Sequence, residues 1–212
     1  MEKVIIFDLD GTIVTEPEFY KNVYSGTLNE VVGKERGKTG LDMLQYCRRE
    51  FDGKGELALF ALNIPYRKWA DKLINAPLDL IPELPEVVWK LKSIAAKKVI
   101  YTGSPIKMAL RMLDKIGFSK EDFDFICGWK EPEIFPVKWT CSSMPFRYIL
   151  RKFKADPRKS WSVGDEWETD LKPAQVIAIN TAEVRKHNGN PTIRVPTLQA
   201  FLDHLEGEKG GD

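Results

Sequence analysis

The feature that most restricts the fold of this chain is an apolar run, Val4-Ile5-Ile6-Phe7, that ends directly in Asp8. β-branched and aromatic side chains favour strands, and an unbroken apolar run is typical of a strand that is covered on both faces. Strands of this kind belong to parallel sheets with helices on either side. The beginning of the chain therefore predicts a buried strand of a parallel sheet, with a carboxylate at its carboxyl end.

The later part of the chain alternates between strand and helix patterns. Apolar residues at helical spacing predict helices over 84–95, 106–116, 146–153 and 198–205, and Gly117 is suited to end the second of these helices as a C-cap. Short β-favouring runs lie between these helices, so we expect an α/β fold with a doubly wound parallel sheet. The further strands are predicted over residues 98–101, 123–126, 160–163 and 176–179.

Residues 16–82 interrupt this alternation, because their apolar pattern is mostly helical and contains no convincing strand. The interruption follows the first strand directly, and the alternation resumes afterwards. We therefore expect two domains, an α/β core made of residues 1–15 and 83–212 and a helical domain, residues 16–82, inserted at the carboxyl edge of the sheet.

The overall charge excludes several classes of partner. The chain has 32 basic and 31 acidic residues, a net charge of +1, so no general positive field attracts nucleic acid or an anionic membrane. No uninterrupted apolar run approaches the roughly 18–20 residues of a membrane-spanning helix. The apolar run 4–7 near the N-terminus is too short for the core of a signal peptide. Three cysteines without C-x-x-C spacing argue against a disulfide framework or a zinc site. We expect a cytoplasmic protein that binds neither nucleic acid nor membranes; nothing in the sequence indicates its oligomeric state.

Carboxylates follow two of the predicted strands where each strand ends. Asp8 and Asp10 come after the first strand, where Gly11 allows the chain to turn, and Asp165 and Asp170 follow a later strand. Ligands of an open parallel sheet bind beyond the carboxyl ends of its strands, so we expect these side chains to converge. Carboxylate and carbonyl oxygens are the ligands that Mg²⁺ prefers. The sequence therefore predicts a magnesium site at this edge of the sheet.

An anion-binding element is expected at the same edge. Thr102 and Gly103 follow the strand over 98–101 and precede a helix, where a hydroxyl and backbone amides can hold an anion. Acids, a cation that neutralises them and donors for an oxyanion together form a coherent phosphoryl-transfer site. A simpler interpretation of Thr102 is that it caps the helix that begins near Pro105.

In combination, these motifs resemble those of the haloacid dehalogenase-like (HAD) superfamily. Asp8-Leu9-Asp10-Gly11-Thr12 after an apolar strand matches the first family motif in full. Thr102 matches the second motif, and Gly164-Asp165 with Asp170 matches the fourth. The resemblance covers the Rossmann-like core, whereas the inserted helical domain matches the cap domain of the family only by position and helical character.

The resemblance implies a role for each acid. Asp8 would be the nucleophile that attacks phosphorus and forms an aspartyl-phosphate, and Asp10 would protonate the leaving oxygen and later deprotonate the attacking water. The Asp8 carboxylate, the Asp10 carbonyl and the Asp165 carboxylate would hold Mg²⁺. Asp170 would hold these ligands in place without touching the metal, or would bind the metal through a water molecule.

The third family motif is a lysine that offsets the negative charge around the nucleophile, and two lysines compete for it. Lys138 stands a short turn before the helix near Phe146, whereas a Pro-rich stretch follows Lys130. We favour Lys138 as the catalytic and phosphate-binding lysine and keep Lys130 as the alternative. The Thr102 hydroxyl and the Gly103 amide would complete the binding of the phosphoryl oxygens.

The sequence thus favours a Mg²⁺-dependent phosphatase that acts on a small phosphorylated metabolite. Phosphatases and phosphomutases of the family carry an acid at the position of Asp10, for which a dehalogenase has no need. A phosphomutase is the alternative within the same chemistry. A receiver-like phospho-aspartate regulatory protein is the alternative from another class, although the long insertion after Asp8 argues against it. No motif in residues 16–82 identifies the substrate.

Overall fold

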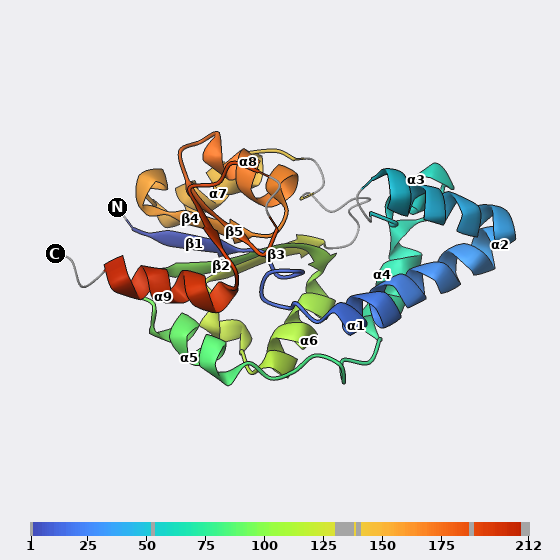
Figure 1. Cartoon of the computed structure of the whole chain (residues 1–212), viewed down its shortest axis with the longest axis horizontal. Helices are drawn as coiled ribbons and strands as arrows, with labels where there is room; N and C mark the ends of the chain where they lie inside the picture. The colour runs from blue at the N-terminus through green and yellow to red at the C-terminus, as the bar shows by residue number, and fades with distance from the viewer. Residues whose placement is uncertain (1, 52–53, 130–137, 139–140, 187–188, 209–212) are drawn as a thin grey trace. The chain divides into compact units, whose positions relative to one another are not determined.

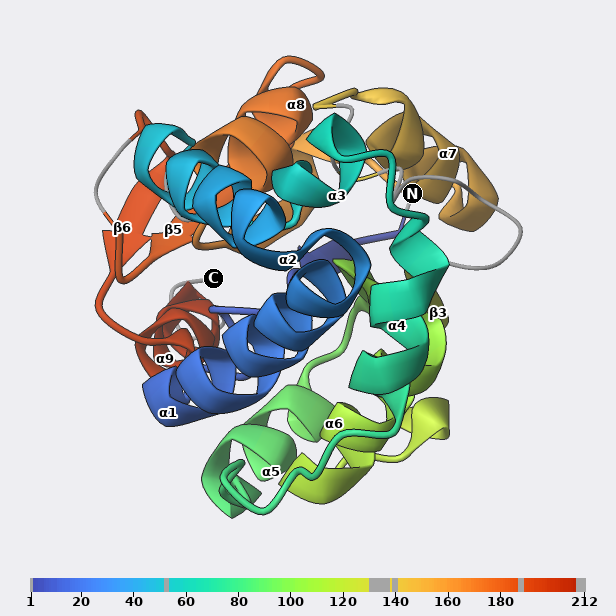
Figure 2. The same ribbon diagram turned by 90° about the vertical axis from the view of Figure 1, so that its right-hand side faces the viewer.

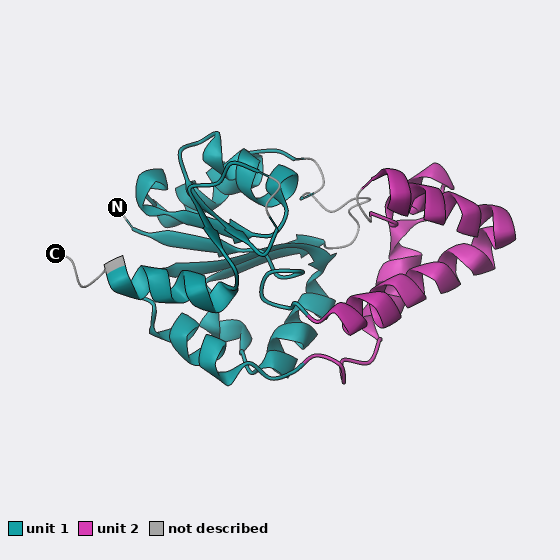
Figure 3. Cartoon of the chain, in the orientation of Figure 1, with its two compact units in different colours: residues 1–15, 82–130, 136–212 teal, residues 16–81, 131–135 magenta. Residues whose placement is uncertain are grey.

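A computed structural model of the chain describes residues 2–51, 54–129, 138, 141–186 and 189–208 (Figure 1). These residues divide into two compact units (Figure 3). Residues 16–51 and 54–81 form the helical unit, and the remaining described residues form the α/β unit. In the part of the chain that the structure describes, no helix is both long and apolar enough to cross a membrane.

The α/β unit is built on a six-stranded sheet in which all neighbouring strands are parallel. Its strands are β1 (Val4–Phe7), β2 (Lys97–Pro105), β3 (Phe125–Trp129), β4 (Trp161–Gly164), β5 (Asn180–Val184) and β6 (Ile193–Val195). Their order across the sheet is β3-β2-β1-β4-β5-β6, so the chain moves outward from β1 in one direction and then returns to continue in the other. The predicted doubly wound sheet is confirmed. Its order reverses beside β1, which is where ligands of such sheets bind.

Helices cover both faces of this sheet (Figures 1 and 2). Two helices lie on one face, α7 (Met144–Phe153) and α8 (Lys172–Gln175). The other face is covered by α5 (Pro85–Ser93), α6 (Ile106–Ile116) and α9 (Leu198–Glu208). Short turns of 3₁₀ helix at Lys120–Asp122 and Pro157–Lys159 and a π-helical turn at Trp167–Leu171 complete the unit. Because both faces are covered, every side chain of β1 is buried.

The predicted helices of the core are confirmed, with bounds that differ by a few residues at most. α6 has the predicted bounds, and Gly117 follows it in the left-handed conformation with φ of 111°. Glycine adopts this conformation without a steric penalty, which explains why the helix ends there. The predicted strands over 4–7, 98–101 and 160–163 correspond to β1, β2 and β4.

The prediction of a strand over 176–179 is wrong. Val176 is 72% exposed and Ala178 has a left-handed φ of 64°, so this segment is a turn that follows α8. The strand is β5, which begins at Asn180 and has no continuous apolar run. It buries Glu183 by pairing this carboxylate with Arg194 Nε on β6 at 3.1 Å, and hydrophobic patterning does not reveal such a contact.

Two smaller differences concern β3 and β6. β3 begins at residue 125 rather than 123, because the Asp124 carboxylate accepts a hydrogen bond from the Lys98 amide at 2.9 Å and pairs with Lys97 at 2.9 Å before the strand starts. β6 was not predicted, since its three residues are too few to give an alternating pattern.

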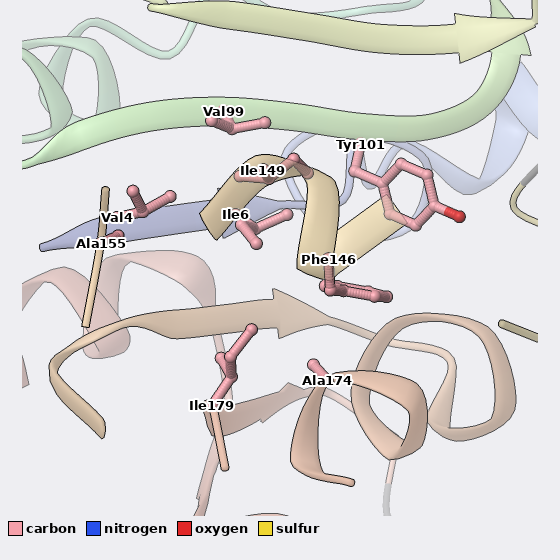
Figure 4. Close-up of a cluster of buried hydrophobic side chains, with 9 residues drawn as sticks. All are labelled: Val4, Ile6, Val99, Tyr101, Phe146, Ile149, Ala155, Ala174 and Ile179. Carbon is pink, nitrogen blue, oxygen red and sulfur yellow. The ribbon is translucent and has the colours of Figure 1, made fainter. Parts of the chain in front are cut away.

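A buried apolar cluster joins the sheet to α7 (Figure 4). Phe146 is fully buried, and its ring meets that of Tyr101 edge to face, with 5.2 Å between the centroids. Aromatic pairs favour this geometry because the positive edge of one ring meets the negative face of the other. The cluster fixes the strand β2 close to its carboxyl end. Its members are Val4, Ile6, Val99, Tyr101, Phe146, Ile149, Ala155, Ala174 and Ile179.

The helical unit contains no strand among its described residues. It consists of α1 (Pro17–Phe19), a π-helical turn (Tyr20–Tyr24), α2 (Ser25–Glu50), α3 (Leu57–Ala61) and α4 (Tyr66–Ile74). α2 changes direction at Gly37, whose φ of 57° and ψ of −144° are not helical (Figure 2). Trp69 of α4 is buried and donates its indole N–H to Thr27 Oγ1 of α2 at 3.0 Å, which links the two helices.

Truncating the apolar cluster should destabilise the protein. Phe146→Ala should lower the free energy of unfolding by about 3–5 kcal/mol, because it removes buried surface and leaves a cavity. Tyr148 lies on the same helix and is 57% exposed, so Tyr148→Ala should cost less than about 1 kcal/mol. Urea unfolding of the two variants measures both values, and equal losses would contradict the proposed packing.

Candidate active site

The loop after β1 is a tight turn that backbone hydrogen bonds hold in place. The Leu9 carbonyl accepts hydrogen bonds from the amides of Ile13 at 3.0 Å and Val14 at 2.9 Å. Gly11 sits in the turn with φ of 84°, a conformation that suits glycine. The Asp8 amide continues the sheet by donating to the Val163 carbonyl of β4 at 2.9 Å. These hydrogen bonds therefore fix the backbone from which Asp8 and Asp10 project.

Two glycines allow the site's loops to approach each other closely. A Cβ atom on Gly11 would lie 2.5 Å from Asp165 Oδ2, and one on Gly164 would lie 2.4 Å from Asp170 Oδ2. Carboxylates therefore occupy the space that any larger residue at these positions would need. This explains, in steric terms, why glycine stands beside the acid in both motifs.

Three of the predicted site residues come together in a buried acidic cluster. Asp8, Asp165 and Asp170 are each less than a tenth exposed, and each offers a carboxylate oxygen within 4.8 Å of the others. Thr12 Oγ1 donates to Asp8 Oδ2 at 2.9 Å. Asp165 Oδ1 is buried and has no hydrogen-bond partner among the described residues. A buried oxygen of this kind is costly unless a cation or a donor approaches it, and the arrangement therefore suits a hard metal ion such as Mg²⁺.

Asp170 is held by the π-helical turn Trp167–Leu171 and by β4. Its Oδ2 accepts from the Glu166 amide at 3.1 Å, and its Oδ1 accepts from Thr169 Oγ1 at 3.0 Å. Ser162 of β4 donates its hydroxyl to the Asp170 carbonyl at 2.8 Å. These contacts turn the carboxylate back toward Asp8.

Lys138 lies inside the acidic cluster. Its ammonium group forms an ion pair with Asp8 Oδ1 and another with Asp170 Oδ1, the latter at 2.8 Å, and its side chain is only 8% exposed. Burial lowers the pKa of Lys138, but the neighbouring Asp170 and Asp8 carboxylates outweigh this effect and raise it above its ordinary value. The lysine is therefore charged. Lys130, the alternative for the third motif, lies outside the described residues.

A second lysine, which the sequence analysis did not single out, reaches the edge of the cluster. Lys186 follows β5 and pairs with Asp165 Oδ2 at 3.1 Å and with Glu166. Burial raises the pKa of Asp165 to about 6, with Lys186 acting in the opposite direction. Lys186 could have been recognised in the sequence as a basic residue just beyond the carboxyl end of the strand next to β4. It was missed because that strand was predicted at residues 176–179 rather than at Asn180–Val184.

Asp10 is bound by two hydroxyls of β2. Thr102 Oγ1 and Ser104 Oγ both donate to Asp10 Oδ2, each at 2.8 Å. The interpretation of Thr102 as a helix cap is wrong, since the N-cap of α6 is Pro105 and no side chain among the described residues caps this helix. Gly103 lies between the two hydroxyl residues and is half-buried. Ser104 was not predicted as a site residue, because β2 was expected to end at residue 101.

The electrostatics of the cluster favour a further positive charge. Burial raises the pKa of Asp8 well above its ordinary value, Lys138 lowers it, and the carboxylates of Asp170, Asp165 and Asp10 raise it again. Several carboxylates beside one buried ammonium group leave an excess of negative charge in a medium of low dielectric constant. A divalent cation bound among these carboxylates would relieve this repulsion.

A family profile described as haloacid dehalogenase-like hydrolase matches residues 5–184. The fold is similar to that of a magnesium-bound HAD protein, YfnB from Bacillus subtilis, at 16% identity with a TM-score of 0.66, covering 96% of this chain and 98% of that one. No curated protein sequence matches.

Two further similar structures are of proteins named for different activities. One is a HAD phosphatase from Thermococcus onnurineus, at 19% identity with a TM-score of 0.58, covering 97% of this chain and 98% of that one. The other is a 2-haloacid dehalogenase from Pseudomonas syringae pv. Tomato DC3000, at 14% identity with a TM-score of 0.59, covering 98% and 100%. At such low identity these likenesses concern the fold alone.

Removing the buried lysine should destabilise the protein strongly. Lys138→Met should lower the free energy of unfolding in metal-free buffer by about 3–5 kcal/mol, because it leaves buried carboxylates without their partner. Lys186→Met is the matched control, since the side chain of Lys186 is 43% exposed and its loss should cost about 1 kcal/mol or less. Denaturant unfolding compares the two variants. A small and equal loss in both would contradict the position of Lys138 in the cluster.

Proposed function

Because the chain belongs to the haloacid dehalogenase-like hydrolase family, we propose that it is a Mg²⁺-dependent phosphatase that hydrolyses a small phosphorylated metabolite. The observation that supports this proposal most directly is Asp10, a second carboxyl group in the turn that follows the nucleophile. Phosphate ester cleavage needs an acid for the leaving oxygen, whereas a halide leaves without a proton. The dehalogenase activity named for one of the similar structures is therefore the less suitable chemistry for this chain.

In the first proposed step, Asp8 attacks phosphorus. One carboxylate oxygen of Asp8 forms the new bond to phosphorus while the bond between phosphorus and the ester oxygen breaks. The leaving oxygen takes the electron pair of that bond, and Asp10 gives it a proton. The product of this step is an aspartyl-phosphate on Asp8 and a free alcohol.

In the second step, water replaces the substrate alcohol. Asp10, now ionised, takes a proton from a water molecule, and the water oxygen attacks phosphorus. The bond between phosphorus and Asp8 breaks, which restores the carboxylate and releases inorganic phosphate. A hydroxyl of a second substrate in place of water would make the same chain a phosphomutase, so release of inorganic phosphate distinguishes the two activities.

The acidic cluster fits Mg²⁺. Asp8 and Asp165 would hold the ion with their carboxylates and Asp10 with its carbonyl, while Asp170 supports them or binds through water. When bound, the ion supplies positive charge for the phosphoryl oxygens. Asp165 Oδ1, which is buried and finds no hydrogen-bond partner in the described part of the chain, supports this proposal, because it is a hard oxygen donor in a site rich in negative charge.

Three further residues would bind the phosphoryl group. Lys138, which contacts the nucleophile, would neutralise charge on the phosphoryl oxygens, and Thr102 and Gly103 would donate hydrogen bonds to them. We also propose that the helical unit, residues 16–82 as expected from the sequence, serves as a cap domain that selects the substrate. A domain that selects the substrate would have to admit it, and interdomain movement is described for the similar YfnB structure.

Binding of Mg²⁺ should stabilise the protein through Asp165. At about one hundred times its dissociation constant, Mg²⁺ should raise the free energy of unfolding by about 2.7 kcal/mol, and Asp165→Asn should lose most of this gain. Glu168 is an acid on the same loop that is 55% exposed and pairs with Lys172, so Glu168→Gln is the matched control and should keep the gain. Thermal unfolding with and without Mg²⁺ measures the difference. Equal gains in both variants would exclude Asp165 as a ligand.

The catalytic proposal is tested by phosphate release. The wild-type protein with Mg²⁺ should release inorganic phosphate from phenyl phosphate, and Asp8→Asn should lower the rate by about three orders of magnitude or more, because the nucleophile is lost. Chloropropionate serves as the control substrate and should release no chloride. Chloride release without phosphatase activity across a panel of phosphate esters would overturn the proposal in favour of a dehalogenase.

A further inference from the structure

Ser104 contacts Asp10, yet the chemistry proposed above gives Ser104 no role. Ser104 is only 4% exposed, and its hydroxyl donates to Asp10 Oδ2 at 2.8 Å. Thr102 donates to the same oxygen, also at 2.8 Å. β2 runs through both positions as far as Pro105, and its pairing register with β3 shifts between Tyr101 and Pro105. This irregular end of the strand directs two hydroxyls at one oxygen of Asp10, the acid of the proposed chemistry.

These two hydroxyls are not equivalent once a phosphate is bound. A hydroxyl carries one proton and can donate one hydrogen bond at a time. If Thr102 donates to a phosphoryl oxygen, as proposed above, it can no longer donate to Asp10. Ser104 then remains as the hydroxyl that holds the Asp10 carboxyl group. The Ser104 amide also donates to Thr102 Oγ1 at 3.0 Å. This bond uses a lone pair of the hydroxyl oxygen and not its proton, so the proton can turn from Asp10 to a phosphoryl oxygen.

We propose that Ser104 is the positioning residue for Asp10, and that it keeps this carboxyl group aimed at the leaving oxygen when Thr102 turns to the phosphate. The proposal rests on the phosphatase chemistry described above. Because Ser104 donates to Oδ2, that oxygen acts as an acceptor, and the proton that passes to the leaving group is carried by Oδ1. Ser104 itself touches no reacting atom in this account and acts only through Asp10.

The dependence of rate on the leaving group tests this role. An acid matters most for a poor leaving group and little for one that leaves readily as an anion. The parameter to compare is kcat/KM, because it reports the steps up to release of the leaving group and is unaffected by the later hydrolysis of the aspartyl-phosphate. Phenyl phosphate and dinitrophenyl phosphate are suitable probes, since both are aryl phosphate esters and dinitrophenolate leaves far more readily as an anion than phenolate.

Ser104→Ala should lower kcat/KM for phenyl phosphate by about tenfold, a part of the roughly 10²–10⁴-fold that general acid catalysis contributes. The value for dinitrophenyl phosphate should fall by less than about twofold, because little acid catalysis is lost there. Ser104→Thr, which keeps a hydroxyl, should restore the ratio between the two substrates. Thr102→Val should lower both values to a similar extent, since its hydroxyl is assigned to the phosphoryl group.

Ser160→Ala is the control for the loss of a buried serine hydroxyl. Ser160 is fully buried at the opposite end of the sheet, where its hydroxyl donates to the Asp156 carbonyl at 2.7 Å. This variant should lose stability and leave the ratio between the two substrates unchanged. Equal losses on both probes in Ser104→Ala would overturn the positioning role and leave a purely structural one. Absence of turnover in the wild-type protein would instead reject the phosphatase proposal itself.

Discussion

The interaction on which the rest of the site depends is the burial of Lys138 between two carboxylates. The side chains of Lys138, Asp8 and Asp170 are each less than a tenth exposed, so three charges are removed from water. Removing ions from water costs several kcal/mol each, and only close pairing and hydrogen bonds offset that cost. The neighbouring Asp165 adds a further carboxylate to the group. The carboxylates of this cluster outnumber its buried ammonium group, which is the charge balance that the proposed Mg²⁺ site requires.

The sheet supplies the stability that allows this arrangement. β1 and β4 are neighbouring parallel strands, with Phe7 opposite Val163, so their following acids meet although they are far apart in sequence. The parallel order of the sheet directs every strand end to one edge, and the reversal beside β1 places the two motifs there together. Glycines at the turns then admit the carboxylates at close range. Backbone geometry thus brings together the carboxylates that Lys138 pairs with.

The sequence predicted the parts of this structure that local patterns determine. The buried first strand, the helix of residues 106–116 and the acids after β1 and β4 follow from apolar runs and turn residues. Ser104 and Lys186 could not be found in this way, because each depends on where a strand ends. β2 continues past the apolar run that marks it, and β5 is a polar strand whose buried Glu183 is stabilised by an arginine from β6. Contacts between strands, rather than composition, decide those positions.

The most direct test of the account is to locate the covalent intermediate. The protein is mixed with phenyl phosphate and Mg²⁺, quenched in acid within a fraction of a second, digested and analysed by mass spectrometry. The account predicts a phosphoryl group on the peptide that contains Asp8, on that residue alone, and its disappearance as inorganic phosphate is released. Steady turnover with no phosphorylated peptide, or with the phosphoryl group on a different residue, would contradict it.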